Sequence, residues 1–282
     1  MSGILGLVVL SIFATVVWWG ATGVLLLLTA RDESTYGRSV AAVTAVALCG
    51  LAAVVASRDL ETAEGAIVAF LASIAIWAAI EVAFLMGFVV GPNRAPCPAA
   101  ATTWQRFTGA AAALASHEIA LVAAMVLLLI IAGGSPNPLA LHVFMLLWAM
   151  RLSTKLNIFF GVANSNAELL PARVAYLKSY FGRLPINAFF PLSVTAASVV
   201  TVLLGSSALA STSDFEATSY ALLAAFSALA VLEHWALVLP LASTALWPWC
   251  ATADADLQGE RADPARAPVT APHALEAQPR DA

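Results

Sequence analysis

Seven ionisable side chains lie inside long apolar stretches of this chain, and they are the residues that could do chemistry. They are Glu81, His117, Glu118, Arg151, Lys155, Glu233 and His234. If those stretches cross a membrane, each charge costs roughly 2.5 to 3.5 kcal/mol and needs a partner. Three carboxylates face two permanent cations, so one further proton on a histidine or a carboxylate makes the set neutral. This arithmetic predicts one shared polar cluster. A rise of about 1.5 Å per residue, counted from the nearest inner end of each span, puts all seven residues in the cytoplasmic half of the membrane.

The two cations constrain that cluster most strongly. Arg151 and Lys155 are four residues apart and therefore share one helix face, where they repel each other unless carboxylates from other helices lie opposite. Arg151 also lies too deep to reach water by extending its side chain. We therefore expect Arg151 to form a buried pair with at least one of Glu81, Glu118 and Glu233.

The residue types in the cluster are compatible with three functions. Its ion pairs could fix the register of the helices. His117 or His234 could serve as the axial ligand of a metal or pigment, with bacteriochlorophyll or haem as the cofactor. The groups could also form a proton or ion path. A di-iron centre is disfavoured, because the chain has adjacent His and Glu residues and no Glu-x-x-His pair. No catalytic motif is present, so we assign no catalytic residue and no metal site.

The elements that must position these residues are membrane-spanning helices. Of 282 residues, 61% are hydrophobic and 11% are charged, about half the charged fraction of a soluble domain. The formal net charge of −4 argues against a nucleic-acid partner. A span needs about 20 apolar residues. Seven segments qualify, which predicts an all-α polytopic bundle in the lipid bilayer: 3–28, 39–56, 65–90, 107–132, 139–160, 187–210 and 216–241.

The basic residues between these spans set the orientation. With the N-terminus outside, the inner connections hold seven Lys and Arg residues, whereas the outer connections hold only Arg58. We therefore expect an outer N-terminus and a cytoplasmic C-terminus. The chain divides into a transmembrane domain, 1–249, and a Pro-rich, charged tail, 250–282, which the composition predicts to be disordered. Three cysteines at unrelated spacings exclude a disulfide framework.

The long inner connection, 162–186, has a pattern of its own. Leu170, Val174, Leu177 and Phe181 recur at the spacing of one helical face. This pattern predicts an amphipathic helix lying at the membrane interface. Such a helix is either a connector on the lipid surface or a docking surface for a partner.

Several sequence blocks resemble one family of bacterial membrane proteins, the photosynthetic complex assembly proteins of the PuhE type. The resemblance covers nearly all of residues 15–249. Its most specific blocks are GPNRAPCP (91–98), SHEIA (116–120), WAMRLSTKLNIFFGVAN (148–164), PINAFFPLSVT (185–195) and LEHWALVLP (232–240). Two positions depart from the family pattern. Ile80 stands where a histidine commonly precedes the third-span carboxylate, and the segment after Phe181 is less basic.

The resemblance implies a multi-pass protein of the bacterial inner membrane, either cytoplasmic or intracytoplasmic and photosynthetic. It further implies a role in assembling the reaction centre and its core antenna, or in supplying them with bacteriochlorophyll. The partners would be reaction-centre and core-antenna subunits or pigment-synthesis enzymes. The family brings no catalytic residues, so an enzyme is the less favoured interpretation. The alternative is a membrane enzyme or a pigment- or metal-binding protein that uses the Glu, His and Arg cluster.

Overall fold

Seven long helices make up most of the structure, a computed structural model that describes residues 3–239. They are α1 (Ile4–Thr29), α2 (Tyr36–Ser57), α3 (Ala63–Leu85), α4 (Thr103–Ala132), α5 (Leu139–Phe160), α6 (Phe189–Ala210) and α7 (Asp214–Ala236). Short 3₁₀ helices lie between them: η1 (Glu33–Thr35), η2 (Ala167–Leu169) and η3 (Ala172–Tyr180). All seven long helices are apolar enough to cross a membrane, and residues 3–239 contain no strand. The predicted fold class and the count of seven spans are confirmed.

Side chains cap the N-termini of α3, α4 and α7, which shifts the predicted boundaries of these helices by a few residues. The Thr102 hydroxyl accepts a bond from the Gln105 amide N–H, and the Gln105 side chain accepts one from the Thr102 amide N–H. This reciprocal cap starts α4 ahead of the predicted apolar segment. Ser213 likewise caps α7 by accepting a bond from the amide of Glu216. The boundary between the predicted domain 1–249 and the tail 250–282 lies outside the described residues.

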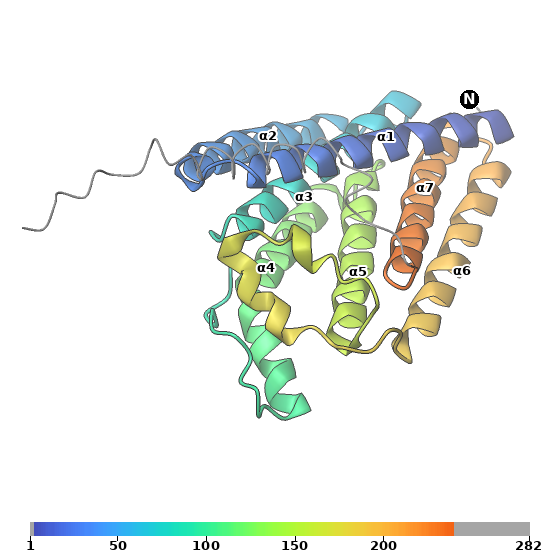
Figure 1. Cartoon of the computed structure of the whole chain (residues 1–282). Helices are drawn as coiled ribbons and strands as arrows, with labels where there is room; N and C mark the ends of the chain where they lie inside the picture. Colours follow the sequence, from blue (N-terminus) through green and yellow to red (C-terminus); the bar gives the residue numbers. More distant parts are fainter. Residues whose placement is uncertain (1–2, 240–282) are drawn as a thin grey trace, which may run out of the picture.

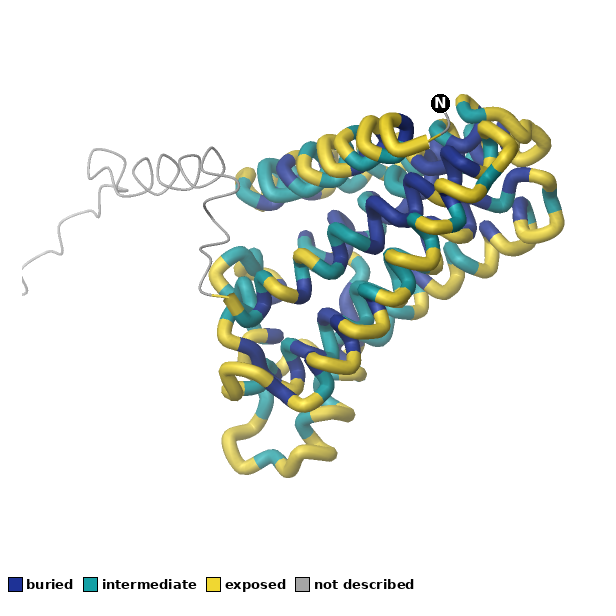
Figure 2. Tube along the Cα trace, turned by 90° about the vertical axis from the view of Figure 1, so that its right-hand side faces the viewer, coloured by how far each residue is buried: buried dark blue, intermediate teal, exposed yellow. Residues whose placement is uncertain are grey.

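Helices α3 and α7 form the centre of the bundle. In each, 56% of the most apolar window is buried, against 17 to 22% in the other five helices. Figure 1 shows α1 and α2 running across the page, above α5, α6 and α7, which run down it. Figure 2 shows exposed residues along much of the helix surface. Many of these are large and apolar, as at Ile12, Ile130 and Val202, which suits a bundle surrounded by lipid.

The hydrophobic core includes the N-terminal and central parts of α3, α5 and α7. Phe70 on α3 meets Phe226 on α7 edge to face, with 4.8 Å between ring centroids. Trp77 on α3 meets Phe144 on α5 in the same way at 5.1 Å. Such edge-to-face pairs add to the energy of area burial. The core therefore fixes these three helices against one another and leaves their C-terminal parts for the polar residues.

The connections between helices gather in two groups. In one, the Asn137 side chain donates to the carbonyl of Ser57, and its amide donates to the carbonyl of Arg58. In the other, Arg173 pairs with Glu33 at 3.0 Å and the Cys97 amide donates to the Ser179 hydroxyl. The segments expected outside thus contact each other, as do those expected inside.

The segment 162–186 contains the helices η2 and η3, which are of the 3₁₀ type and differ from the α-helix that the pattern predicts. In η3, Val174, Leu177 and Tyr180 are buried at a spacing of three residues, as a helix with three residues per turn requires. This face packs on Phe84 and Ala113. Figure 1 shows the segment in yellow, in front of α4 and α5. Its apolar face is therefore covered by protein rather than by lipid.

Candidate functional site

The candidate site lies toward the C-terminal ends of α3, α5 and α7. Glu81 comes from α3, Arg151 and Lys155 from α5, and Glu233 from α7. Contacts between the connecting segments place the C-terminal ends of α5 and α7 together, because the Asn164 amide donates to the carbonyl of Leu237 at 2.8 Å. His117 and Glu118 lie at the middle of α4.

Four of the predicted residues form a continuous chain across α3, α4 and α5. Lys155 Nζ lies 2.6 Å from Glu118 Oε1 and 3.3 Å from His117 Nδ1. His117 Nε2 lies 3.6 Å from Glu81 Oε1. Trp148 Nε1 donates to the other oxygen of Glu118 at 3.2 Å. His117 Nδ1 also lies 3.5 Å from Glu118 Oε1, so the ring stands between the carboxylates of Glu81 and Glu118.

The deepest part of this chain is not fully hydrogen-bonded. His117 is 0% exposed and Glu81 is 6% exposed. Within the described residues, neither Glu81 Oε1 nor His117 Nε2 has a hydrogen-bond partner, because their separation exceeds a hydrogen-bond length. Buried polar atoms without partners are rare in native proteins and call for a water, an ion or a ligand.

Arg151 faces Glu233 across a second, looser contact. Arg151 Nη1 lies 3.9 Å from Glu233 Oε2, and the Arg151 side chain is 43% exposed. Over residues 3–239, no acceptor lies within hydrogen-bond distance of the guanidinium. Arg151 thus has the expected carboxylate partner, Glu233, but the pair is open rather than buried.

His234 belongs to neither group. Its Nδ1 donates to the carbonyl of Ala230 at 2.7 Å, and its Nε2 lies 2.9 Å from the Ser153 hydroxyl. A carbonyl can only accept, so Nδ1 carries a proton. The fully buried ring ties α5 to α7. The seven predicted residues therefore divide into a chain of four, a pair and one isolated histidine.

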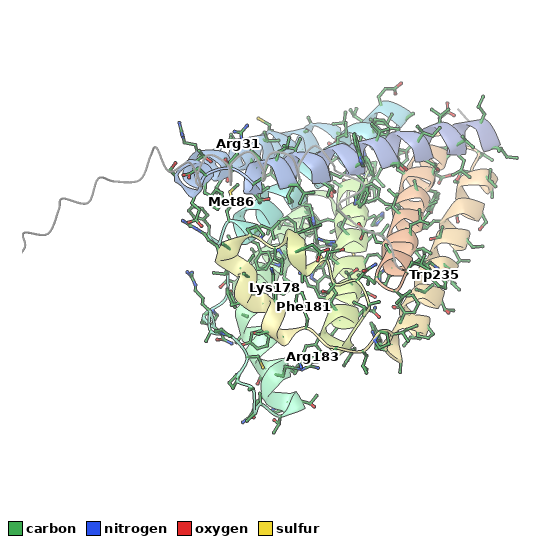
Figure 3. All side chains as sticks on the ribbon, in the orientation of Figure 1. Arg31, Met86, Lys178, Phe181, Arg183 and Trp235 are labelled. Atoms are coloured by element: carbon green, nitrogen blue, oxygen red, sulfur yellow. The ribbon has the colours of Figure 1, made fainter. Side chains whose placement is uncertain are left out.

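A cavity of about 440 Å³ lies beside these groups. It is bounded by α1, α3, α4, α5, α7 and the segment that carries η3. Four of the seven predicted residues line it, namely Glu81, Arg151, Lys155 and Glu233, whereas His117, Glu118 and His234 do not. Most of the remaining wall is apolar, and its aromatic members are Trp18, Trp77, Phe84, Phe159, Tyr180, Phe181 and Phe226. Figure 3 labels Phe181 on the segment that covers this side of the bundle.

The positions of His117 and His234 decide whether either ring could bind a cofactor in the cavity. Both histidines are fully buried, and each has at least one ring nitrogen engaged by a neighbouring side chain. Within residues 3–239, no group of three His, Cys, Asp or Glu residues is placed to hold a metal ion. A molecule in the cavity would therefore meet carboxylates, a guanidinium and an ammonium group, and not an imidazole.

Sequence reasoning missed a buried amide network that positions the covering segment. Asn157 on α5 is 0% exposed and donates to the Ser193 hydroxyl on α6 at 3.0 Å. Asn187 donates to the carbonyl of Gly161 at 2.8 Å and accepts bonds from the first amides of α6. Gly161 has φ +123, and a Cβ there would lie 2.5 Å from the amide nitrogen of Leu184. The available signal in the sequence was an uncharged polar residue within an apolar span.

Comparisons with known proteins agree over nearly the whole chain. A family profile described as "Protein of unknown function (DUF3623)" matches residues 4–258. The chain is 36% identical over 237 residues to a Rhodobacter capsulatus protein, covering 83% of this chain and 86% of that protein. That relative is named an uncharacterized 30.4 kDa protein in the puhA 5' region. No solved structure matches the chain.

Proposed function

The chain belongs to the DUF3623 family of proteins of unknown function, and we propose that it is an assembly factor for the anoxygenic photosynthetic apparatus. The observation that carries the proposal is the Rhodobacter capsulatus relative, whose name places it in the puhA 5' region. The sequence blocks that resemble the PuhE type support the same assignment. On this proposal the protein acts on the reaction centre and core antenna, or on the supply of bacteriochlorophyll to them.

The seven spans make this a multi-pass membrane protein. We place it in the bacterial inner membrane, either cytoplasmic or intracytoplasmic, with the N-terminus outside and the C-terminus in the cytoplasm. The distribution of basic residues supports this orientation. The pairing of Arg173 with Glu33 joins two connections that this orientation puts on one side of the membrane.

Contact within the bilayer is the mode of action that the surface favours. Large apolar side chains are exposed along α1, α4 and α6, for example Leu5, Ile119 and Leu203. Without a hydrophobic force between helices in lipid, such surfaces associate through close packing. Reaction-centre subunits, core-antenna subunits or pigment-synthesis enzymes are the partners we propose.

The cavity favours a second candidate, a membrane enzyme or a pigment-handling protein. Four charged residues meet a mainly apolar space there, as ligand sites commonly combine them. Axial ligation by His117 or His234 is not supported by the geometry, because neither ring lines the cavity. This candidate therefore depends on Glu81, Arg151, Lys155 and Glu233.

A gene deletion in a phototrophic host tests the proposed function. We expect lower absorbance of the reaction-centre and core-antenna bands, with growth in the absence of phototrophy unchanged. A plasmid carrying the intact gene should restore both bands. Normal pigment–protein levels in the deletion strain would contradict the assembly role.

A further inference from the structure

Arg151 lines the cavity, and its guanidinium group has no hydrogen-bond acceptor within the described residues. It lies near the middle of α5, and its guanidinium carries five N–H donors. Within the described residues its nearest carboxylate oxygen is 3.9 Å away, beyond hydrogen-bond distance. A guanidinium at this position in a membrane helix needs an acceptor. The cavity that it lines is where such an acceptor can enter.

Glu81 lines the same cavity as Arg151, but its Oε1, which has no hydrogen-bond partner in residues 3–239, is buried and lies 3.6 Å from His117 Nε2, away from the open space. This side chain is 6% exposed. Around both polar groups the wall is apolar and rich in aromatic rings, including Trp18 and Trp77. The cavity of about 440 Å³ lies within the range of small-molecule sites. Its occupant must therefore be largely apolar and polar at one end.

The charges around the cavity select the kind of polar end. Lys155 is already held by Glu118 at 2.6 Å, and Glu233 lies beside Arg151. An anionic group on Arg151 would lie next to the Glu233 carboxylate and be repelled by it. A cationic group would leave the donors of Arg151 unused. A neutral oxygen acceptor can accept hydrogen bonds from Arg151 without adding a charge beside Glu233.

We propose that the cavity binds a neutral, lipid-soluble molecule whose ester or ketone carbonyl accepts hydrogen bonds from Arg151. Its apolar body lies between α1 and α3, against Trp18 and Trp77. This inference goes beyond the proposed assembly role and does not depend on it, because binding is measured on the purified protein. A bilayer lipid ester and a free carbonyl compound share this chemistry.

Tryptophan fluorescence tests the proposal with a matched pair of probes. Methyl 9,10-dibromostearate and 9,10-dibromostearic acid have the same quenching bromines and differ only in the charge of the polar end. The Trp77→Phe variant isolates the cavity signal, since the difference between the two proteins reports quenching at Trp77. We expect the ester to quench Trp77 at a concentration at least about tenfold lower than the acid.

Substitutions of Arg151 and Glu233 should both reduce the preference for the ester, for different reasons. Arg151→Met should weaken ester quenching by about tenfold or more, because a hydrogen bond to a charged donor is lost. Glu233→Gln should shift the preference toward the acid, because it removes the repelling carboxylate. Arg38→Met, on the exposed surface of α2, is the matched control and should change neither.

A third variant covers the case in which Arg151→Met fails to fold. Ala78→Leu narrows the cavity without changing its charge, and we expect it to weaken quenching by the ester. To separate the two ligand sources, a dibrominated phosphatidylcholine and a short-chain quinone are titrated in competition with the ester. Displacement by either one supports the site and names its source. Tighter binding of the acid to the unaltered protein, or ester quenching unaffected by all three cavity variants, would overturn the proposal.

Discussion

At the scale of single residues, Lys155 holds the polar chain together. It reaches from α5 to Glu118 and His117 on α4, and its contact with Glu118 is the closest of the ion pairs in residues 3–239. The side chains of Lys155 and Glu118 are 23% and 27% exposed. Their contribution to stability should therefore lie between roughly 1 kcal/mol for an exposed pair and roughly 3 to 5 kcal/mol for a buried one.

Removing Lys155 should leave Glu118 as an uncompensated charge in the membrane. We expect Lys155→Met to lower the amount of folded protein in membranes several-fold, measured by immunoblot and by size-exclusion chromatography in detergent. Lys155→Met combined with Glu118→Gln should recover much of it, because both charges are then absent. The matched control combines Lys155→Met with Glu233→Gln, which removes a carboxylate from the other pair. Equal recovery in both double variants would show that Glu118 is not the specific partner.

At the scale of elements, Tyr180 fastens η3 to the connection between α3 and α4. Its hydroxyl accepts a bond from the Asn93 side chain at 2.8 Å and donates to the carbonyl of Ala95 at 2.9 Å. Tyr180 also lines the cavity, and η3 packs against α4. The hydroxyl therefore links the covering segment of the cavity to the neighbouring connection.

Tyr180→Phe should release this connection while keeping the aromatic ring in place. Cys97 lies within it, and its amide bonds to Ser179. In a Cys49→Ser, Cys250→Ser background, we expect Cys97 to react several times faster with a water-soluble maleimide after Tyr180→Phe. Tyr176→Phe is the control, because the Tyr176 hydroxyl has no hydrogen-bond partner within residues 3–239. Unchanged labelling after Tyr180→Phe would mean that the ring alone holds the connection.

At the scale of the whole molecule, the alternation of seven spans agrees with the two groups of connections. Asn137 joins the connection after α4 to the end of α2. On the other side, Asn93 and Tyr180 join the connections after α3 and α5. An odd number of spans places the two ends of the transmembrane domain on opposite sides of the membrane.

Reporter fusions should establish which side is which. Alkaline phosphatase is active only outside the cytoplasm, so a fusion after Pro136 should be active and a fusion after Asp254 should be inactive. A fluorescent protein that folds only in the cytoplasm should give the reverse pattern at the same two positions. Activity after Asp254 together with none after Pro136 would reverse the proposed orientation.

The sequence by itself determined the number of spans, the all-helical class and the residues that carry charge in the membrane. These features depend on local composition, because about 20 consecutive apolar residues are sufficient to define a span. The capping boundaries at Thr102 and Ser213 and the 3₁₀ form of η3 depend on finer local contacts, and a pattern of apolar residues does not reveal them.

Only the tertiary structure decided how the charged residues pair. Spacing along one helix gives the face that Arg151 and Lys155 share, but the residues opposite are set by how α3, α4, α5 and α7 pack. That packing places Lys155 against Glu118, leaves Arg151 open to a cavity and turns His234 toward Ser153. The cavity itself is a property of several helices at once. Pairing and shape are three-dimensional, and the order of residues alone does not encode the distances between helices.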